Sequence, residues 1–357
     1  MIQRPILVIN TGNTSTKVAL FDSYHPLCVE SLRHSDEELA QFKDINSQEQ
    51  FREQLIQQWL EAKRPLLEGR PLVAVAARGG LLRPLESGTY LVNEKMLHDL
   101  REGKRGMHAS HLSAQAGFGI ATKIGVPCYI VDPISVDEYE PIARLSGHKL
   151  FERVALSHAL NMKAVAKRYA REKGVNYNKI TLIVVHLGSG ISVSIHKDGR
   201  MIDGINSSEE GPFSPDRSGS LPSLQVARYC LENKLEYKQF SKMIFGDGGL
   251  YSYLNTKEFL KAIEMYNSGN PEAITVVNAM AYQVAKEIGA MATVNDGHVD
   301  DILITGGMAY STFFVDLIKK RVAFIAPVLI YPGEDEMEAL AEGICRVLDH
   351  EEEAKLY

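Results

Sequence analysis

The chain has 357 residues, of which 45% are hydrophobic, and a formal net charge of −6. This length predicts two domains with full cores, and an acidic balance with no basic stripe argues against a nucleic-acid partner. No apolar run has the length of a signal peptide or a membrane span, which predicts a cytoplasmic protein without a membrane partner. The four cysteines are widely spaced, which indicates buried thiols rather than a disulfide framework or a zinc site: Cys28, Cys128, Cys230 and Cys345.

Short apolar runs alternate with longer helical patterns along the chain, which is typical of an α/β fold. Five runs are predicted to be buried strands: residues 6–9, 72–77, 128–131, 181–185 and 302–305. Polar or glycine residues follow each run: Asn10, "RGG" at 78–80, Asp132, "HLGSG" at 186–190 and "GG" at 306–307. Ligands of open α/β sheets bind beyond the carboxyl ends of the strands, so these residues predict one shared cleft, although most of them also suit ordinary turns.

The polar turn after the first strand, "NTGNTSTK" at residues 10–17, offers hydroxyls, amides and one positive charge, and therefore predicts a phosphate site. An internal echo supports this interpretation. Placing Gly12 on Gly188 superposes "ILVINTGNTSTKVAL" on "LIVVHLGSGISVSI", and the second copy continues through the turn "HKDG" into "RMID". The echo predicts duplicated halves, each of which offers a glycine-bearing hairpin to one phosphate chain through backbone N–H groups.

Four motifs in this order carry a family resemblance: "NTGNTSTK" (10–17), "HLGSG" (186–190), "DRSGSLP" (216–222) and "TGG" (305–307). From the first strand to about residue 345 the chain resembles the acetokinase family of the actin, sugar-kinase and Hsp70 superfamily. The stretches "ARGGLLRPL", "GPFSPDRSGSLP" and "GGLYSYL" resemble butyrate kinases rather than the longer acetate kinases. The resemblance implies an α/β fold of two ribonuclease-H-like domains with a cleft between them. Residues 1–147 plus 340–357 would form the N-terminal, acid-binding domain, and residues 148–339 the nucleotide-binding domain.

The activity implied by the resemblance is reversible transfer of the ATP γ-phosphoryl group to a short-chain carboxylate, with ADP as product, Mg²⁺ as cofactor and butyrate as the expected acid. Such an acid is already ionised at neutral pH, so the reaction needs charge compensation and no general base, whereas a sugar kinase must deprotonate a hydroxyl. Acetate, propionate or branched-chain acids are alternatives, and so is a non-catalytic actin-like or Hsp70-like ATP-binding protein. A homo-oligomer, dimeric or larger, is also expected.

Nucleotide-binding residues carry over from the family's motifs by position. Asn13 stands where serine is more usual and Ser189 where butyrate kinases often have glycine. The carried-over set is Asn10, Ser15, Lys17, His186, Gly188, Gly190, Gly306 and Gly307. The stretch "GDGGL" (246–250) is expected to form the adenosine slot together with Gly306 and Gly307.

Two arginines are the expected cationic groups of the reaction. Arg217 in "DRSG" matches the family's arginine that neutralises the transferring phosphoryl group, and its alternative is a surface salt bridge with Asp216. Arg78 is the candidate for binding the carboxylate substrate, because a guanidinium pairs with it bidentately. In acetate kinases the corresponding arginine lies a few residues earlier, where this chain has Val75, so the angle of approach must differ. His108 or His111 is expected to assist.

His158 and two carboxylates complete the expected site. Helical spacing from Phe151 through Met162 to Tyr169 places His158 on an apolar helix face, where a core histidine is the default, whereas "SHALN" resembles the family's phosphoryl-contacting histidine. Asp132 and Glu336 are the expected Mg²⁺-side carboxylates, with some contacts running through water.

Overall fold

The computed structural model describes residues 4–357, which form two compact units. The first unit runs to Val136 and takes in Asp335–Tyr357, and the second is Asp137–Glu334. The domain boundaries predicted from the sequence, at 147/148 and 339/340, stay a prediction. Within the described residues no helix combines the length and the apolar character that a bilayer crossing requires. The four cysteines are free thiols, of which Cys128 and Cys345 are buried and Cys28 and Cys230 are partly exposed.

The first unit is built on a seven-stranded sheet in the order β12-β5-β6-β4-β1-β2-β3. Strands β1, β4 and β6 are parallel to one another, and β1, β2 and β3 form an antiparallel meander. The bounds of the strands are β1 Pro5–Thr11, β2 Ser15–Asp22, β3 His25–Arg33, β4 Ala74–Arg78, β5 Thr89–Leu91, β6 Cys128–Val131 and β12 Lys355–Leu356.

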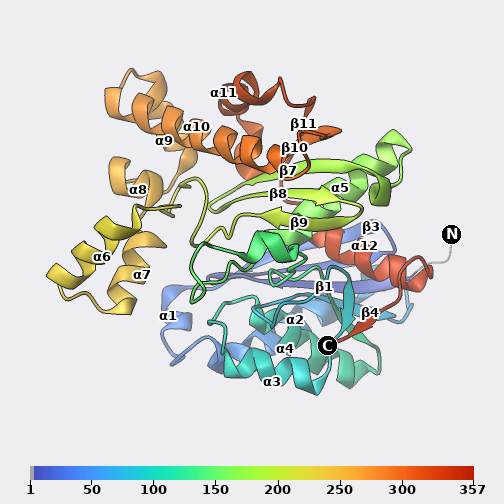
Figure 1. Cartoon of the computed structure of the whole chain (residues 1–357). Helices are drawn as coiled ribbons and strands as arrows, with labels where there is room; N and C mark the ends of the chain where they lie inside the picture. Colours follow the sequence, from blue (N-terminus) through green and yellow to red (C-terminus); the bar gives the residue numbers. More distant parts are fainter. Residues whose placement is uncertain (1–3) are drawn as a thin grey trace. The chain divides into compact units, whose positions relative to one another are not determined.

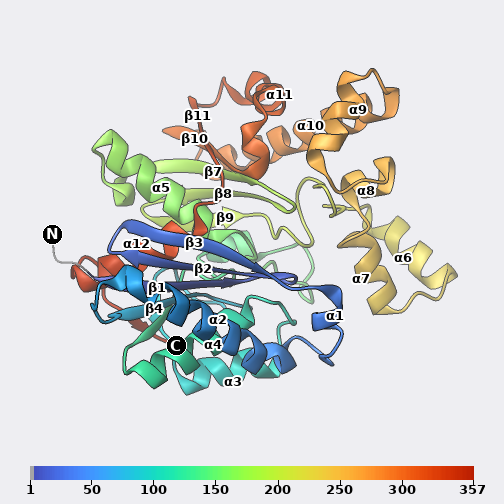
Figure 2. The ribbon, with the colours of Figure 1, turned by 180° about the vertical axis from the view of Figure 1, so that it is seen from behind.

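Helices cover both faces of this sheet (Figures 1 and 2). Alternate residues of β1, such as Leu7 and Ile9, pack in one core with the helices α2 and α4. The opposite face meets α12, where Gly343 lies against Val131. The helical segments of the unit are α1 Asp36–Leu39, η1 Asn46–Gln48, α2 Glu49–Lys63, η2 Arg64–Leu67, α3 Glu94–Glu102, α4 His111–Ile124 and α12 Glu336–Leu348.

The second unit repeats the same plan in a five-stranded sheet of order β11-β10-β7-β8-β9. Strands β7, β10 and β11 are parallel, and β7, β8 and β9 form an antiparallel meander. This order corresponds strand for strand to β6-β4-β1-β2-β3 of the first unit, so the predicted duplication is confirmed. The bounds are β7 Thr181–Leu187, β8 Ile191–Lys197, β9 Arg200–Gly204, β10 Asp301–Gly306 and β11 Val328–Pro332.

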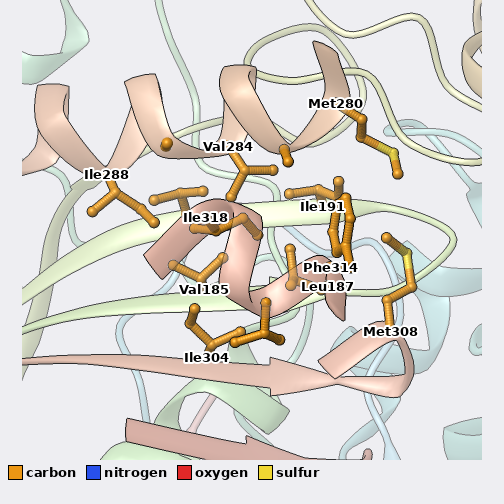
Figure 3. Packing of buried hydrophobic residues seen from close by; sticks show 14 of the residues in the cluster. Val185, Leu187, Ile191, Met280, Val284, Ile288, Ile304, Met308, Phe314 and Ile318 are labelled. Carbon is orange, nitrogen blue, oxygen red and sulfur yellow. The ribbon is translucent and has the colours of Figure 1, made fainter. Parts of the chain in front are cut away.

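The core of the second unit lies between its sheet and the helices α10 and α11 (Figure 3). Val185 and Leu187 of β7 meet Val284 and Ile288 of α10 and Phe314 of α11. Helix α5 also packs on β7 and β10. The helical segments are η3 Pro141–Arg144, α5 Ala159–Lys173, η4 Tyr177–Lys179, α6 Ser223–Glu232, α7 Tyr237–Ile244, α8 Gly249–Leu254, α9 Phe259–Asn267, α10 Pro271–Thr293, η5 Gly307–Tyr310 and α11 Thr312–Val322.

The five predicted strands are confirmed as β1, β4, β6, β7 and β10. The helix predicted from Phe151 onward is wrong in its first eight residues, because α5 begins only at Ala159. The preceding segment bridges to Leu145 through Glu152, and Arg153 anchors it by donating to Glu210 and Asp203. Phe151 is accordingly 67% exposed rather than part of a helix core.

Candidate active site

The first hairpin places two predicted phosphate-binding residues side by side. Asn10 at the end of β1 is paired in register with Lys17 of β2, and directly opposed residues of an antiparallel pair share one face of the sheet. Asn10 is buried, Lys17 is exposed and Ser15 is partly exposed. The turn between the strands is closed by a hydrogen bond from the Gly12 N–H to the Ser15 carbonyl, at 2.8 Å.

Asn10, Arg78 and Glu336 meet at the carboxyl ends of β1 and β4. The Asn10 Nδ2 donates to Glu336 Oε2 at 2.6 Å, and Arg78 Nη1 donates to the same oxygen at 2.9 Å. Arg78 also lies 3.4 Å from Asn10 Oδ1. Glu336 is the first residue of α12 and only 8% exposed, so the arginine compensates a nearly buried charge. The structure thus brings together three residues that were predicted from far-apart motifs.

Asp132 has different partners. It is 2% exposed, and its Oδ1 accepts hydrogen bonds from Ser87 Oγ at 2.6 Å and from the Gly88 N–H at 2.7 Å. Among residues 4–357 no group of three or more His, Cys, Asp and Glu side chains is arranged to hold a metal ion. Mg²⁺ usually takes only one or two protein carboxylates and completes its shell with water and phosphate oxygens, so the role of Glu336 and Asp132 on the Mg²⁺ side stays a prediction.

Two histidines stack in the second unit. His158 is the residue before α5, and its ring lies parallel to that of His186 with 3.9 Å between centroids. His158 Nδ1 is 2.9 Å from Ser192 Oγ on β8. The sequence-based placement of His158 on an apolar helix face is therefore wrong, because its ring lies against polar groups at the end of β7. Its role toward the phosphoryl group stays a prediction.

Asn161 orients the ring of His186. Its Oδ1 is 2.8 Å from His186 Nδ1, and an amide oxygen only accepts, so the Nδ1 carries a proton. The other ring nitrogen, Nε2, is buried without a hydrogen bond among the described residues and lies 3.3 Å from Glu334 Oε1. An alanine Cβ at Gly188 would lie 2.8 Å from this Nε2, so the glycine gives the ring its space.

Arg217 lies against the turn of the second hairpin. Its Nη1 donates to the Ser207 carbonyl at 3.1 Å and to Ser207 Oγ at 3.0 Å, and its guanidinium covers the Phe245 ring at 4.4 Å. Its Nε and Asp216 Oδ1 are 3.9 Å apart, and each is buried without a hydrogen bond in the described part of the chain. Burial raises the pKa of Asp216 and lowers the pKa of Arg217.

Glycine is required where this arginine meets the hairpin. An alanine Cβ at Gly190 would lie 2.4 Å from Arg217 Nη1 and 2.5 Å from its Cζ. The loop that carries Arg217 is tied to the same turn by Ser214 Oγ, which donates to the Ser189 carbonyl at 2.5 Å. Hairpin and arginine therefore pack closely against each other.

A hollow of about 630 Å³ opens beside the second hairpin within the same unit. Its volume is in the range of ligand pockets, and its lining combines apolar walls with charged groups. The lining residues include Gly188, Ser189, Lys257, Phe259, Gly307, Met308, Tyr310 and Glu334.

The other predicted glycines divide by role. Gly307 lines this hollow, whereas Gly306 has φ +92° and would bring an alanine Cβ within 2.4 Å of the Leu187 carbonyl. Gly306 therefore serves the close approach of β10 to β7. Residues 246–250 lie against the Arg217 loop, where an alanine Cβ at Gly249 would be 1.8 Å from the Ser214 carbonyl.

His111 is committed to the fold. Its Nδ1 bonds the Leu100 carbonyl at 3.0 Å, and its Nε2 accepts from the Leu81 N–H at 3.0 Å. Both nitrogens of the neutral ring are thus occupied, and burial lowers its pKa. The suggestion that His111 assists Arg78 is wrong for this reason, while exposed His108 pairs locally with Ser110.

Part of the second unit is similar to a known protein family. Residues 151–325 match the acetokinase family. The matched segment contains His158, His186, Gly188, Gly190 and Arg217.

Solved structures extend the likeness over nearly the whole chain. An acetate kinase from Porphyromonas gingivalis is 16% identical, with a TM-score of 0.77 over 96% of this chain and 99% of that one. A propionate kinase from Francisella tularensis is 17% identical, with a TM-score of 0.74 over 95% and 98%. An acetate kinase from Entamoeba histolytica is 14% identical, with a TM-score of 0.76 over 95% and 98%. The likeness confirms the predicted fold class, mixed α/β with two sheets in two domains.

Sequence reasoning missed several side chains of the matched segment that hold the predicted ones. These are Asn161 beside His186, Ser192 beside His158 and Ser207 beside Arg217. The motif "SHALN" contains Asn161 three residues after His158, and in the first turn of a helix that spacing places both on one side. The serines lie in ordinary strand and loop contexts with no local signal.

Proposed function

We propose that the protein is an ATP-dependent acyl kinase that transfers the γ-phosphoryl group to a short-chain carboxylate, with butyrate as the preferred acid, and that the reaction is reversible. The observation that carries this proposal is the cluster of Arg217, His158 and His186 around a glycine hairpin beside a nucleoside-sized hollow, inside the region that matches the acetokinase family.

The chemistry suits this set of groups. A carboxylate oxygen attacks the γ-phosphorus, the bond to the β–γ bridging oxygen breaks, and ADP leaves without any net proton transfer. All reacting groups are anionic, so catalysis depends on donors and positive charge aimed at the phosphoryl group. Arg217 supplies a guanidinium whose Nε has no acceptor among the described residues, and it is the positive charge that we assign to the phosphoryl group. No general base is required.

Groups of the first unit complete the proposal. We assign phosphate binding to Asn10, Ser15 and Lys17, the first and last of which are cross-strand neighbours. We assign the carboxylate substrate to Arg78, whose side chain is 20% exposed at the end of β4. Mg²⁺, which neutralises charge on the phosphates, would be held on the protein side by Glu336 and Asp132. A cytoplasmic homo-oligomer without a nucleic-acid or membrane partner is part of the same proposal.

Hydroxamate trapping of acyl phosphate tests the reaction and the acid together, with acids of two to five carbons as substrates and glucose and glycerol as controls. Butyrate carries two more methylenes than acetate, each contributing about 0.8 kcal/mol when buried, so we expect kcat/KM to rise about fifteenfold from acetate to butyrate. A branched four- or five-carbon acid should also react.

Each other outcome has a defined meaning. An acetate-sized pocket reverses the order, since overpacking costs about 1 to 3 kcal/mol, and a preference for acetate above about tenfold would make the butyrate assignment wrong while the reaction class survives. ATP binding without product from any acid would favour the non-catalytic ATP-binding alternative. ADP formation with glucose or glycerol, and with none of the acids, would identify a sugar or polyol kinase.

A further inference from the structure

A buried arginine lies directly beneath the first hairpin. Arg52 belongs to α2 and is 0% exposed. Its Nη1 donates to the Ser15 carbonyl at 3.0 Å and to Thr16 Oγ1 at 2.8 Å, and its Nη2 donates to the Asn13 carbonyl at 3.0 Å. Nη2 and Nε also donate to Gln48 Oε1, at 2.9 and 3.2 Å. All five guanidinium N–H groups therefore have acceptors.

None of these acceptors carries a negative charge. Two are backbone carbonyls, one is a hydroxyl and one is an amide oxygen, and within residues 4–357 Arg52 takes part in no ion pair. Burial lowers the pKa of Arg52 to about 10, so the group stays protonated at neutral pH. A buried charge without a counter-ion is unfavourable, which leaves a positive charge under the turn that an anion at the turn would offset.

The hydrogen bonds of Arg52 also set the direction of the turn's peptide groups. In a trans peptide the C=O and the following N–H point in opposite directions, and the described chain contains no cis peptide. When Arg52 draws the Asn13 carbonyl inward, the N–H of Thr14 points outward, away from the core. An outward N–H above a buried cation can donate to an anion at the turn.

We propose that Arg52 is a positioning residue for the phosphate chain of the nucleotide: it fixes the turn at residues 12–16 from below and supplies an uncompensated positive charge to bound phosphate. The inference rests on the proposed function in that it takes the anion to be the phosphate chain of ATP. It goes beyond that function because it assigns part of the phosphate affinity to a buried residue that lies outside the motif.

Binding of ATP and of adenosine, measured by titration calorimetry on the full chain without any acid present, tests the proposal. Arg52→Met removes the charge and keeps an apolar stem of similar length. We expect ATP affinity to fall about tenfold, the order given by one charge acting over several ångströms at an effective dielectric near 20. Adenosine affinity, which needs no phosphate site, should stay unchanged, and the loss for ATP should shrink as salt rises.

Arg70→Met is the matched control. Arg70 is another arginine of the first unit that contacts strand β2. It differs from Arg52 in that it pairs with a carboxylate, Asp22 at the far end of that strand, with Nη1 2.6 Å from Oδ2. We expect this variant to lose stability and keep the ratio of ATP to adenosine affinity. If Arg70→Met lowers that ratio as much as Arg52→Met, the effect is one of general loosening and the proposal is overturned.

Arg52→Lys keeps the proposal testable if Arg52→Met does not fold. Lysine retains the charge and cannot make the five hydrogen bonds of the guanidinium. ATP affinity should therefore fall about threefold, which is less than in Arg52→Met, and adenosine affinity should stay constant. Equal losses for both ligands, or no loss for ATP, overturn the proposal. The binding readout is independent of acyl transfer, so a wild-type protein that binds ATP and makes no acyl phosphate contradicts the proposed function and leaves the claim about Arg52 to be decided by these affinities.

Discussion

The two hairpins share a strand plan and use their arginines in opposite ways. Beneath the first turn, every guanidinium N–H of Arg52 donates a hydrogen bond to a protein acceptor, and the turn carries hydroxyl and amide side chains. Beside the second turn, the hydrogen bonds that Arg217 makes within residues 4–357 come from Nη1. The turn itself consists of Gly188, Ser189 and Gly190, and the small residues let the guanidinium lie against it. One arginine holds a backbone in place, and the Nε of the other has no hydrogen bond among the described residues.

The largest expected difference between the two hairpins is the loss of activity when Arg217 is removed. Arg217→Ala should lower kcat about 10²- to 10³-fold, comparable to losing one preorganised donor in other enzymes, with a small effect on ATP binding. Steady-state acyl-kinase assays with butyrate measure this, and Arg217→Lys shows how much a point charge restores. A folded Arg217→Ala enzyme with near-native kcat contradicts the role assigned to this residue.

An added methyl group should break the second turn more than the first. Gly190→Ala places its Cβ 2.4 Å from Arg217 Nη1, so the flexible arginine end must move. We expect kcat to fall about tenfold, or about 1.4 kcal/mol of transition-state stabilisation, with little change in melting temperature, because the arginine end moves and the core does not.

Gly12→Ala is the control for this change, because its nearest neighbours, Ser15 O and Oγ, lie at an ordinary 3.6 Å. We expect it to keep kcat within about threefold of wild type, a difference of less than 1 kcal/mol. In a cycle with Arg217→Ala, Gly190→Ala should add almost nothing, and full additivity would show that the two residues act independently.

The smallest expected effect is the loss of folding stability at low pH, and it arises at His34 beneath the first hairpin. Thr16 Oγ1, which accepts from Arg52, is 3.0 Å from His34 Nε2, and burial together with the Arg52 charge lowers the pKa of His34 to about 4. In the unfolded chain His34 titrates near 6.5, so between about pH 6.5 and 4 the unfolded state binds a proton that the folded state refuses. This contribution to stability is present above pH 6.5 and is lost as the pH falls.

Urea unfolding at pH 7 and pH 5 checks the sign. His34→Gln retains a hydrogen-bonding group and removes the titration, so its stability should depend less on pH than that of the wild type. A wild-type protein that loses no more stability than His34→Gln between these two values would show that His34 is protonated in the folded chain.

Much of the fold was predictable because apolar runs and glycine turns are local signals. The echo between residues 6–20 and the second hairpin predicted two equivalent meanders, and the sheets confirm them. The start of α5 was not predictable from spacing alone. Phe151 and Val154 fit the helical period, but Arg153 is tied to Glu210, which is distant in sequence, and the segment stays extended.

The site was predictable where a motif carries the chemistry and not where a neighbour supports it. Asn10, Arg78 and Glu336 came from separate motifs and meet in the structure. Arg52 was missed because an arginine in a polar helix is usually exposed. Its spacing to Ile56 and Trp59, at i+4 and i+7, placed it on the buried face of α2 and was the available signal.

The C-terminal segment Asp335–Tyr357 belongs to the first unit, and this affects the order in which the chain can fold during synthesis. Glu336 lies 258 residues after Arg78, so a ribosome completes the whole second unit, a contiguous segment, before it releases α12. Strands of the first unit that form before α12 is made expose the apolar face that this helix later covers, to which Ile6 and Val8 belong. Closure over so long a separation is slow, and exposed strand faces are surfaces that chaperones recognise. The carboxylate that neutralises Arg78 is therefore among the last groups to enter the candidate site during synthesis.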